Sequence, residues 1–259
     1  FSPATGANGF DKSVAALAFA NGSLYVGGEF NRYRGGWANG LAKLGVTGVQ
    51  DAGFTAKEST NGRVYSVAVS RSDPAVYFGG IFNAFKKWDA HRIGKVDSRT
   101  GVLDLEFNPQ PGAIGRTNGA NNDVMAIAID PTHSKIYIGG RFNRYRGAMA
   151  APILRLNADG SIDPSFAPTL AGEVRAIAIA PDGSQVFAGG VLSAVNGRNV
   201  GHLATFDSAG VLDSAFHPEG TAGIGPDLSS VDAIALDGDR ILVGGSFTSY
   251  RGGATPYWI

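Results

Sequence analysis

The stretch VAALAFANGSLYVGGEF, residues 14–30, decides the fold class. It consists of an apolar run, an Asn21-Gly22 turn and a second run that carries a Gly-Gly pair. An Asn-Gly dipeptide between two such runs predicts a tight antiparallel hairpin. The pattern returns four more times, beginning with VYSVAV at 64, VMAIAI at 124, VRAIAI at 174 and VDAIAL at 231. Five aligned copies cannot arise by chance, so the sequence predicts a repeat architecture.

Four of the copies continue beyond the hairpin in the same way. A third apolar run follows, such as LAKLGV or ILRLNA, and then a closing segment of the form G-x-x-D-x-x-F. The closing segments are GVQDAGF (48–54), GVLDLEF (101–107), GSIDPSF (160–166) and GVLDSAF (210–216). The Gly-Gly pair recurs about every 50 to 60 residues, a period that fits a four-stranded propeller blade.

We therefore predict an all-β chain: a β-propeller of four-stranded antiparallel blades, with five repeat units visible and the last incomplete. We expect one propeller domain over 1–259, or a fragment of one. The repeat units lie at about 13–54, 64–107, 124–166, 174–216 and 231–259.

The first run of each copy has a small face and a bulky face. Ala176 and Ala178, for example, alternate with Ile177 and Ile179. We expect the bulky face of one blade to fill the space over the small face of the next, since protein interiors are close-packed. The Gly-Gly pair is expected to permit a close backbone approach or a bulge.

Composition removes several classes of function. Lys plus Arg equals Asp plus Glu at 22 each, which gives no global attraction to nucleic acid. No apolar stretch approaches the roughly 20 residues that cross a bilayer, so membrane insertion is not expected. Because the chain has no cysteine, disulfides, thiolate metal sites and thiol nucleophiles are excluded. We predict no cofactor.

With its GSLYVGGEFNRYRG and GVQDAGF segments, the repeat resembles the delta-60 repeat family of bacterial β-propeller proteins. Four units match the Gly-Gly-x-Phe pattern, and Leu192 replaces the Phe in the remaining unit. The resemblance implies the propeller fold and a secreted or cell-surface location. It implies little about activity.

The two ends of the chain fall at different points of the repeat. Phe1-Ser2-Pro3 aligns with the end of a closing segment, and no closing segment follows Tyr250. Since an unpaired strand edge invites aggregation, we expect the missing outer strand to come from a longer polypeptide or from an assembly partner.

The loops between the second and third runs are rich in aromatic and cationic residues, and they form the candidate binding face. One position holds Tyr33, Phe85 and Tyr145, and a cation follows in most repeats. Two interpretations of these cations remain open: an arc that binds carboxylates or phosphates, or side chains that each lie over an aromatic neighbour. The candidate binding residues are Arg34, Trp37, Lys86, Lys87, Trp88, Arg92, Arg146 and Arg251.

Other polar residues favour structural roles. The recurring Asp of the closing segment, as in Asp163, is expected to stabilise a turn, because the 157–163 stretch lacks the distal Glu of a calcium loop. The connections 108–123 and 217–230 are longer than the others and are equally consistent with specificity loops or mobile loops. No nucleophile elbow or metal-ligand spacing is present, so the sequence assigns no catalytic or metal-binding residues.

These observations favour a non-enzymatic extracellular or cell-surface module that binds a protein or polysaccharide partner through the aromatic and cationic loop face. A carbohydrate-binding or polysaccharide-acting propeller is the first alternative, because Trp37 and Trp88 provide stacking surfaces for sugars. A structural spacer in a surface fibre is the second.

Overall fold

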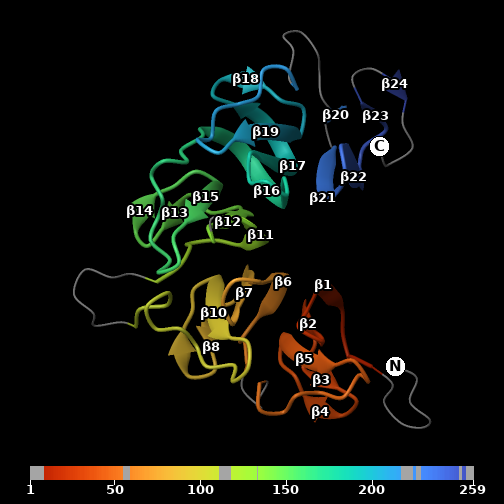
Figure 1. Ribbon diagram of the computed structural model, residues 1–259, viewed down its shortest axis with the longest axis vertical. Helices are drawn as coiled ribbons and strands as arrows, with labels where there is room; N and C mark the ends of the chain where they lie inside the picture. Colours follow the sequence, from red (N-terminus) through yellow and green to blue (C-terminus); the bar gives the residue numbers. More distant parts are fainter. Residues whose placement is uncertain are drawn as a thin grey trace. The chain divides into compact units, whose positions relative to one another are not determined.

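The computed structural model describes residues 9–54, 59–110, 118–132, 134–216, 224–225, 229–250 and 253–254. Every regular element among these residues is a β-strand, and the strands of each hairpin and sheet pair antiparallel, as the sequence predicts (Figure 1). The chain divides into two compact units, one containing 1–127 with 144–148 and the other containing 128–143 with 149–259.

The first unit contains two repeats of the same design, each with a three-stranded sheet. A short hairpin lies between the second and third strands of each repeat. The sheets consist of β1 (Val14–Ala20), β2 (Ser23–Gly28) and β5 (Leu41–Gly45), and of β6 (Arg63–Val69), β7 (Ala75–Ile81) and β10 (Ile93–Asp97). The short hairpins are β3 (Arg32–Tyr33) with β4 (Gly36–Trp37), and β8 (Ala84–Phe85) with β9 (Trp88–Asp89).

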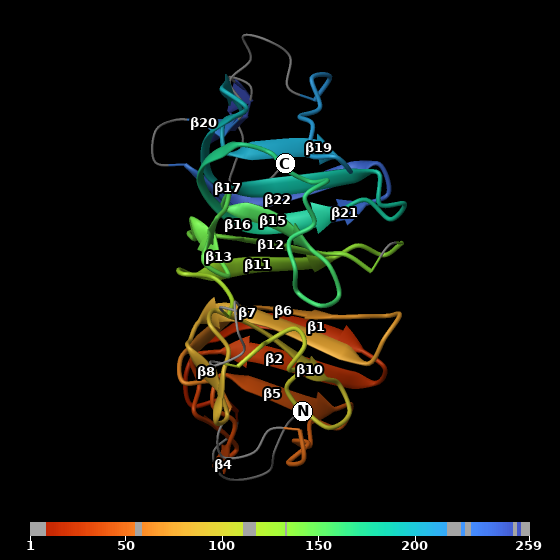
Figure 2. The same cartoon turned by 90° about the vertical axis from the view of Figure 1, so that its left-hand side faces the viewer.

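The second unit repeats this order (Figure 2). The third repeat begins with β11 (Val124–Ile129), which crosses the boundary between the units. Its short hairpin joins β13 (Arg144–Tyr145) to β14 (Ala148–Met149), and residues 144–148 of this hairpin belong to the first unit. Its other strands are β12 (Ile136–Gly140) and β15 (Ile153–Leu156). The fourth repeat contains β16 (Leu170–Ile179), β17 (Gln185–Val195), β18 (Arg198–Asn199) and β19 (Leu203–Asp207). The last contains β20 (Ile224–Gly225), β21 (Ser230–Asp237), β22 (Arg240–Ser246), β23 (Ser249–Tyr250) and β24 (Gly253–Ala254).

The closing segments differ from the prediction of a fourth strand. Each makes one isolated bridge to the third strand of its own repeat, as between Leu44 and Gln50 or between Val96 and Leu103. The chain then turns at the recurring Asp, whose carboxylate accepts backbone N–H groups, as Asp51 accepts from Gly53 and Phe54. This turn ends the pairing after one bridge. Four-stranded blades are therefore not confirmed: the described sheets of the first three repeats have three strands each, and the closing segment adds a single bridge.

The Gly-Gly pair lies opposite a β-bulge of the first strand, in line with the bulge or close approach that the sequence suggests. The register of the first hairpin shifts between Val14 and Ala16, opposite Gly27 and Gly28. The β6–β7, β16–β17 and β21–β22 hairpins have the same shift. A Cβ atom at Gly80 would clash with the Arg63 carbonyl oxygen, so no side chain fits there.

The first glycine of the pair packs against apolar side chains of the next repeat. A Cβ atom at Gly27 would lie 2.7 Å from Val64 Cγ1 and 2.9 Å from Val67 Cγ2. The same relation joins Gly189 to Val231 and Ile234 within the second unit. Bulky side chains of one repeat thus nest against a small position of its neighbour, as expected. They are three residues apart rather than two because the bulge adds a residue to the strand.

The closing Phe anchors each repeat to its second strand. Phe54, Phe107 and Phe166 are each at most 1% exposed. They form edge-to-face pairs with tyrosines of the second strand, at centroid distances of 5.5 Å for Tyr25–Phe54 and 5.0 Å for Tyr137–Phe166. This geometry is favourable for aromatic rings and fixes the closing segment on its own sheet.

The expectations that concern Phe1-Ser2-Pro3 and residues 255–259 lie outside the described residues. So does most of the two long connections, at 111–117, 217–223 and 226–228.

Candidate functional site

The short hairpin that follows the Gly-Gly strand has a turn that requires positive φ angles at its two central residues. Arg34 and Gly35 have φ angles of 46° and 82°, and Arg146 and Gly147 have 46° and 82°. Positive φ at both central residues defines the turn type that suits a two-residue hairpin, and Asn-Gly is its preferred sequence. The fourth repeat has that preferred pair, Asn196-Gly197, with φ of 47° and 79°. A cation at the first position is therefore held against its backbone preference.

The cations at this position fold back onto their own unit. Lys86 Nζ donates to the Gly101 carbonyl oxygen at 3.0 Å, and Arg146 Nη2 donates to the Phe107 carbonyl oxygen at 2.6 Å. Burial lowers the pKa of Lys86. Arg34, Lys86 and Arg146 also lie 5.2, 5.3 and 5.7 Å from the ring centroids of the preceding aromatic residues. This geometry favours the structural interpretation, in which each cation covers its aromatic neighbour, over an outward-facing cationic arc.

The exposed aromatic and cationic side chains of the first hairpin, Trp37 and Arg32, lie on its two strands close to the turn. Trp37 is 40% exposed, and the Arg32 guanidinium stacks over its ring at 3.9 Å. Arg32 Nη1 donates to the Gly35 carbonyl oxygen at 2.9 Å, which pins the guanidinium above the indole. Sequence reasoning missed Arg32. Its signal is the repeated Arg-Tyr-Arg-Gly, in which Arg144 Nη1 makes the equivalent bond to Gly147.

The second repeat has a related pair. Lys87 is exposed, and its Nζ lies 5.1 Å from the centroid of the half-buried Trp88 ring. Met149, which aligns with Trp37, is 70% exposed, whereas Trp88 lies one position earlier in its hairpin, opposite Phe85. Apolar surface beside a cation thus recurs at the tips of these hairpins, whereas the tyrosines and the phenylalanine beside them are buried.

Two other candidate residues have different positions. Arg92 has φ of 66°, and its backbone N–H and carbonyl join Phe82 and Gly80, so its backbone belongs to the entry of the third strand. Arg251 lies outside the described residues.

A second set of residues that sequence reasoning missed fixes the short hairpins at their base. Asp11 Oδ1 accepts the backbone N–H groups of Asn31 and Arg32, at 2.8 and 2.9 Å. Asn61 does the same for Asn83 and Ala84, at 2.9 and 3.0 Å. The signal in the sequence is an Asp or Asn two or three residues before the first strand of each of these repeats.

The recurring Asp of the closing segment bonds to a cation of the third strand. Lys43 bonds to Asp51 at 3.0 Å, Lys95 to Asp104 at 2.8 Å, and Arg155 Nε to Asp163 at 3.0 Å. These cations and the turn N–H groups hold the pKa values of the three carboxyl groups below their usual range, against the opposing effect of burial. The arrangement supports the turn-stabilising role that the sequence suggests for these residues.

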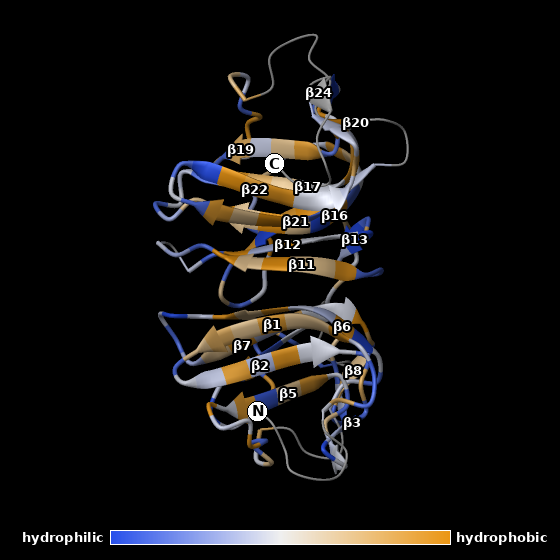
Figure 3. Ribbon diagram, turned by 90° about the vertical axis from the view of Figure 1, so that its right-hand side faces the viewer, coloured by the Kyte–Doolittle hydropathy of each residue, from blue (hydrophilic) through white to orange (hydrophobic). Residues whose placement is uncertain are grey.

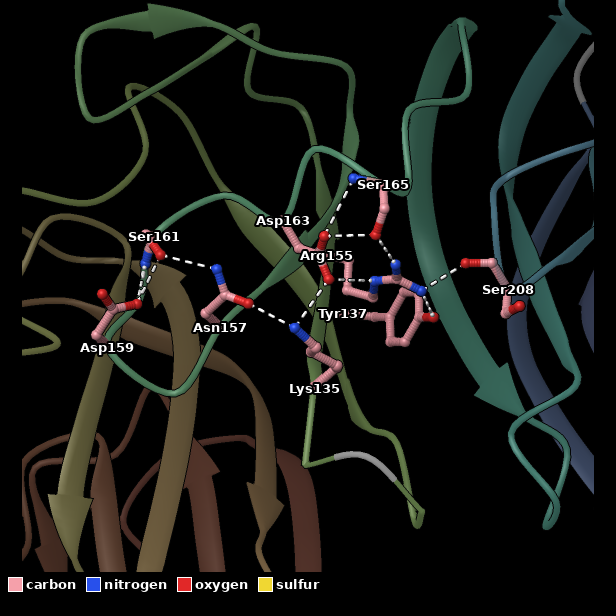
Figure 4. Close-up of polar contacts among 9 residues, drawn as sticks. All are labelled: Lys135, Tyr137, Arg155, Asn157, Asp159, Ser161, Asp163, Ser165 and Ser208. Atoms are coloured by element: carbon pink, nitrogen blue, oxygen red, sulfur yellow. Dashed lines mark hydrogen bonds and ion pairs between the residues drawn. The ribbon is translucent and has the colours of Figure 1, made fainter.

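Arg155 is the centre of the most connected of these clusters (Figure 4). Besides Asp163, it donates to Ser165 Oγ at 2.7 Å and to the Tyr137 hydroxyl at 3.1 Å. It also donates to the Ser208 carbonyl oxygen of the next repeat. Lys135 Nζ supports the same Asp163 carboxylate at 2.9 Å. Arg155 is 8% exposed and Asp163 is 7% exposed, so the cluster joins two repeats from within rather than offering a reactive site.

In the 157–163 stretch, which resembles part of a calcium loop, the polar side chains form hydrogen bonds with protein groups. Asp159 Oδ1 accepts bonds from the backbone and hydroxyl of Ser161, at 2.9 and 2.6 Å, and Asn157 bonds to Lys135 and Ser161. Within the described ranges, no group of three or more His, Asp or Glu side chains is arranged to hold a metal ion.

A polar groove of about 650 Å³ lies beside the short hairpins of the first unit. Arg63 lies 4.0 Å from Glu29 and 5.1 Å from the Tyr65 ring centroid. Lys12 and Asn31 also line the groove. Charges of both signs line the groove together with the aromatic residues Phe30 and Tyr65, and this lining suits a polar ligand better than an apolar one.

In the part of the chain that the structure describes, no helix has the length and apolar character needed to cross a membrane.

Comparison with known proteins supports the propeller character of the repeat. Residues 20–54 and 134–166 match the family model described as "Domain of unknown function (DUF5122) beta-propeller". These segments contain the second strand, the short hairpin, the third strand and the closing segment of the first and third repeats. No curated protein sequence matches the chain.

Among solved structures, the chain is similar to the "extracellular domain of the putative one component system BT4673 from B. thetaiotaomicron". The TM-score is 0.53 at 15% sequence identity, and the match covers 95% of this chain and 28% of that chain. At this identity the likeness concerns the fold alone. The chain spans little more than a quarter of the length of that neighbour.

Proposed function

We propose that this chain is a non-enzymatic, extracellular or cell-surface binding module of the delta-60 propeller type, and that it binds an anionic polysaccharide through the tips of its short hairpins. The observation that carries the proposal is the Arg32 guanidinium, stacked at 3.9 Å on the exposed Trp37 ring. A flat indole offers a stacking surface for a sugar ring, and a guanidinium offers paired donors to a carboxylate or sulfate.

The extracellular part of the proposal is supported by the solved neighbour, which is an extracellular domain, and by the resemblance of the repeats. The binding part is supported by the different positions of the cations. Lys86 and Arg146 bond to main-chain carbonyls of their own unit, whereas Arg32 and Lys87 lie at exposed positions beside tryptophans.

Affinity electrophoresis tests this function with polygalacturonate, alginate and heparin as anionic polymers and dextran as the neutral one. We expect retardation by at least one anionic polymer and none by dextran. In the retarding gel, Trp37→Ala is expected to weaken binding by about fivefold or more, since it removes the indole stacking surface and an aromatic contact contributes roughly 1 kcal/mol.

Arg99→Gln is the matched control for charge. Arg99 is an exposed cation on the turn between the third strand and the closing segment of the second repeat, whereas Arg32 and Trp37 belong to the first repeat. Equal weakening by Arg99→Gln and Arg32→Gln would mean non-specific attraction and contradict the proposed site. Absence of retardation by every anionic polymer would remove the polysaccharide proposal and leave a protein partner or a spacer.

A further inference from the structure

Neighbouring repeats within each unit fit together in one recurring way. Two apolar side chains on the first strand of a repeat, here called the knobs, cover the first glycine of the preceding repeat, here called the hole. The knob pairs are Val64 with Val67, Val124 with Ile127, Val174 with Ile177 and Val231 with Ile234, and they cover Gly27, Gly79, Gly139 and Gly189, respectively.

The fit leaves no room for a side chain at the hole. A Cβ atom would lie 2.7 Å from Val64 at Gly27 and 2.6 Å from Val124 at Gly79. It would lie closer still to Val174 at Gly139 and to Val231 at Gly189. Four repetitions of the same contact define a specific interface, in which glycine is required because the knob occupies the place of its side chain.

The first repeat has knobs that cover no glycine among the described residues. Val14 pairs with Gly28 and Leu17 with Val26, the registers that Val64 and Val67 have in the second repeat. Yet Val14 is 41% exposed and Leu17 is 63% exposed, while Val64 is fully buried. Figure 3 shows β1 in hydrophobic colours over most of its length.

The last repeat has the opposite feature, a hole without knobs. A Cβ atom at Gly244 would meet only Ala233 Cβ, at 3.9 Å, among the described residues. The same face carries Ala235, which is exposed, and Leu242, which is 47% exposed. Gly244 has no positive φ, so neither its backbone nor the described residues around it require glycine at this position.

We propose that these two faces bind each other between copies of this chain, so that Val14 and Leu17 of one copy cover Gly244 of a second copy. The chemistry of the contact is that of the four internal contacts, and the second copy supplies the matching surface. The polar residues at its edge also fit. The place of the Glu29–Arg63 ion pair is taken by Ser246 and Ser13, which introduce no like charges.

Such an interface is head-to-tail, because different surfaces of the two copies meet. Head-to-tail contacts produce closed rings or open chains of copies rather than a two-fold dimer with one shared patch. We therefore expect association to increase with protein concentration.

Sedimentation velocity over a concentration series tests the association. Wild-type chain is expected to form dimers or larger species, whereas Leu17→Glu and Gly244→Val are each expected to remain monomeric. Val211→Glu is the matched control, since Val211 is 59% exposed on a turn outside both faces. Because no described residue except Ala233 approaches a Cβ atom at Gly244, Gly244→Val is expected to fold, as circular dichroism will check. A wild-type chain that stays monomeric at every concentration would overturn the proposal.

Mixing the two monomeric variants provides a sharper test. Leu17→Glu keeps its hole and Gly244→Val keeps its knobs, so the mixture is expected to form a heterodimer that neither variant forms alone. Failure to form it, when the wild type associates, would show that some other surface is responsible and would overturn the proposal.

Cross-linking distinguishes contact between copies from contact within one copy. In the internal interfaces, the knob Cβ lies 3.3 Å from the added Cβ at Gly27 and 3.2 Å at Gly79, close to disulfide spacing. The natural chain has no cysteine to interfere. Mixed Val14→Cys and Gly244→Cys chains are expected to give a disulfide-linked dimer on oxidation. If a chain carrying both cysteines cross-links only within itself, and the mixed chains do not cross-link, the second-copy proposal is wrong.

Discussion

At the scale of single residues, the repeat is held by a few positions whose neighbours leave no alternative. The Gly-Gly pair could be predicted from sequence, because glycine weakens a strand and is required between large apolar residues only at a bulge or a close contact. The role of the cation after the aromatic residue could not be predicted. Arg34 and Lys86 look alike whether they face solvent or fold back, and only the backbone turn and the carbonyls within reach decide between the two.

Gly79→Ala tests the hole at this scale. The new methyl group would lie 2.6 Å from Val124 Cγ1, so we expect a loss of about 1–3 kcal/mol from overpacking. Gly244→Ala is the matched control, and we expect it to change stability by less than about 0.5 kcal/mol, since no described atom except Ala233 Cβ lies nearby. Urea unfolding under monomeric conditions measures both. Equal losses for the two variants would contradict the nested packing.

Arg155→Met tests the buried cluster. It removes the charge while keeping a long apolar stem, and it leaves the Asp163 carboxylate with less compensation. Breaking a buried pair in this way costs about 3 kcal/mol. Arg99→Met, at an exposed turn, is the control and is expected to be nearly neutral. If denaturant unfolding gives the same midpoint for Arg155→Met and the wild type, the cluster does not stabilise the chain.

At the scale of the elements, the three-stranded sheet with a bridged closing segment is a compromise between strand pairing and turn formation. The sequence G-x-x-D-x-x-F predicts the turn and the buried Phe, but not the length of the strand before them. One bridge forms before the Asp carboxylate accepts hydrogen bonds from the next backbone N–H groups. Strand propensity alone does not predict where the turn replaces strand pairing.

The short hairpins depend on one amide or carboxylate each. Asn61→Ala removes the acceptor for the backbone N–H groups of Asn83 and Ala84, so we expect those amides to exchange hydrogen faster by about fivefold, corresponding to about 1 kcal/mol. Exchange measured by NMR checks this. The Arg144 amide, which donates to Asn121 in another repeat, is the internal control and should keep its rate. Unchanged exchange at Asn83 would contradict the capping role.

At the scale of the whole molecule, the carboxylates of the repeats make the free energy of unfolding depend on pH. Turn N–H groups and partner cations lower the pKa values of Asp51, Asp104 and Asp163 in the folded chain, and two arginines lower that of Glu173. In the unfolded chain these groups titrate near their ordinary pKa values of 3.8 and 4.5. Their contribution is therefore complete above about pH 5 and is lost as the pH falls through the lowered folded values.

We expect the free energy of unfolding, measured by urea at a series of pH values, to be level between about pH 5 and 7 and to fall steadily below about pH 4.5. Asp163→Asn is expected to reduce this slope, because one of the depressed carboxyl groups is gone. Asp239→Asn, at an exposed turn, is the control and is expected to retain the slope. A rise in stability on acidification would contradict the assignment of these pKa directions.

The repeat order and the nesting of neighbouring repeats could be predicted from sequence at this scale, since both are encoded in local patterns that recur. The division of the chain into two compact units could not, because the repeats on the two sides of the division have the same sequence pattern.

The knob and the hole lie on opposite faces of every repeat, and each closing segment bonds to its own third strand. Each repeat therefore carries both halves of the same interface, knobs on one face and a hole on the other. Unequal crossing-over within the gene can add or remove such a repeat without the invention of a new interface, so the number of repeats can change readily during evolution while the hairpin tips remain free to diversify. Under the proposed function, selection for binding acts on the hairpin tips, and selection for folding acts on other positions of the same short motif.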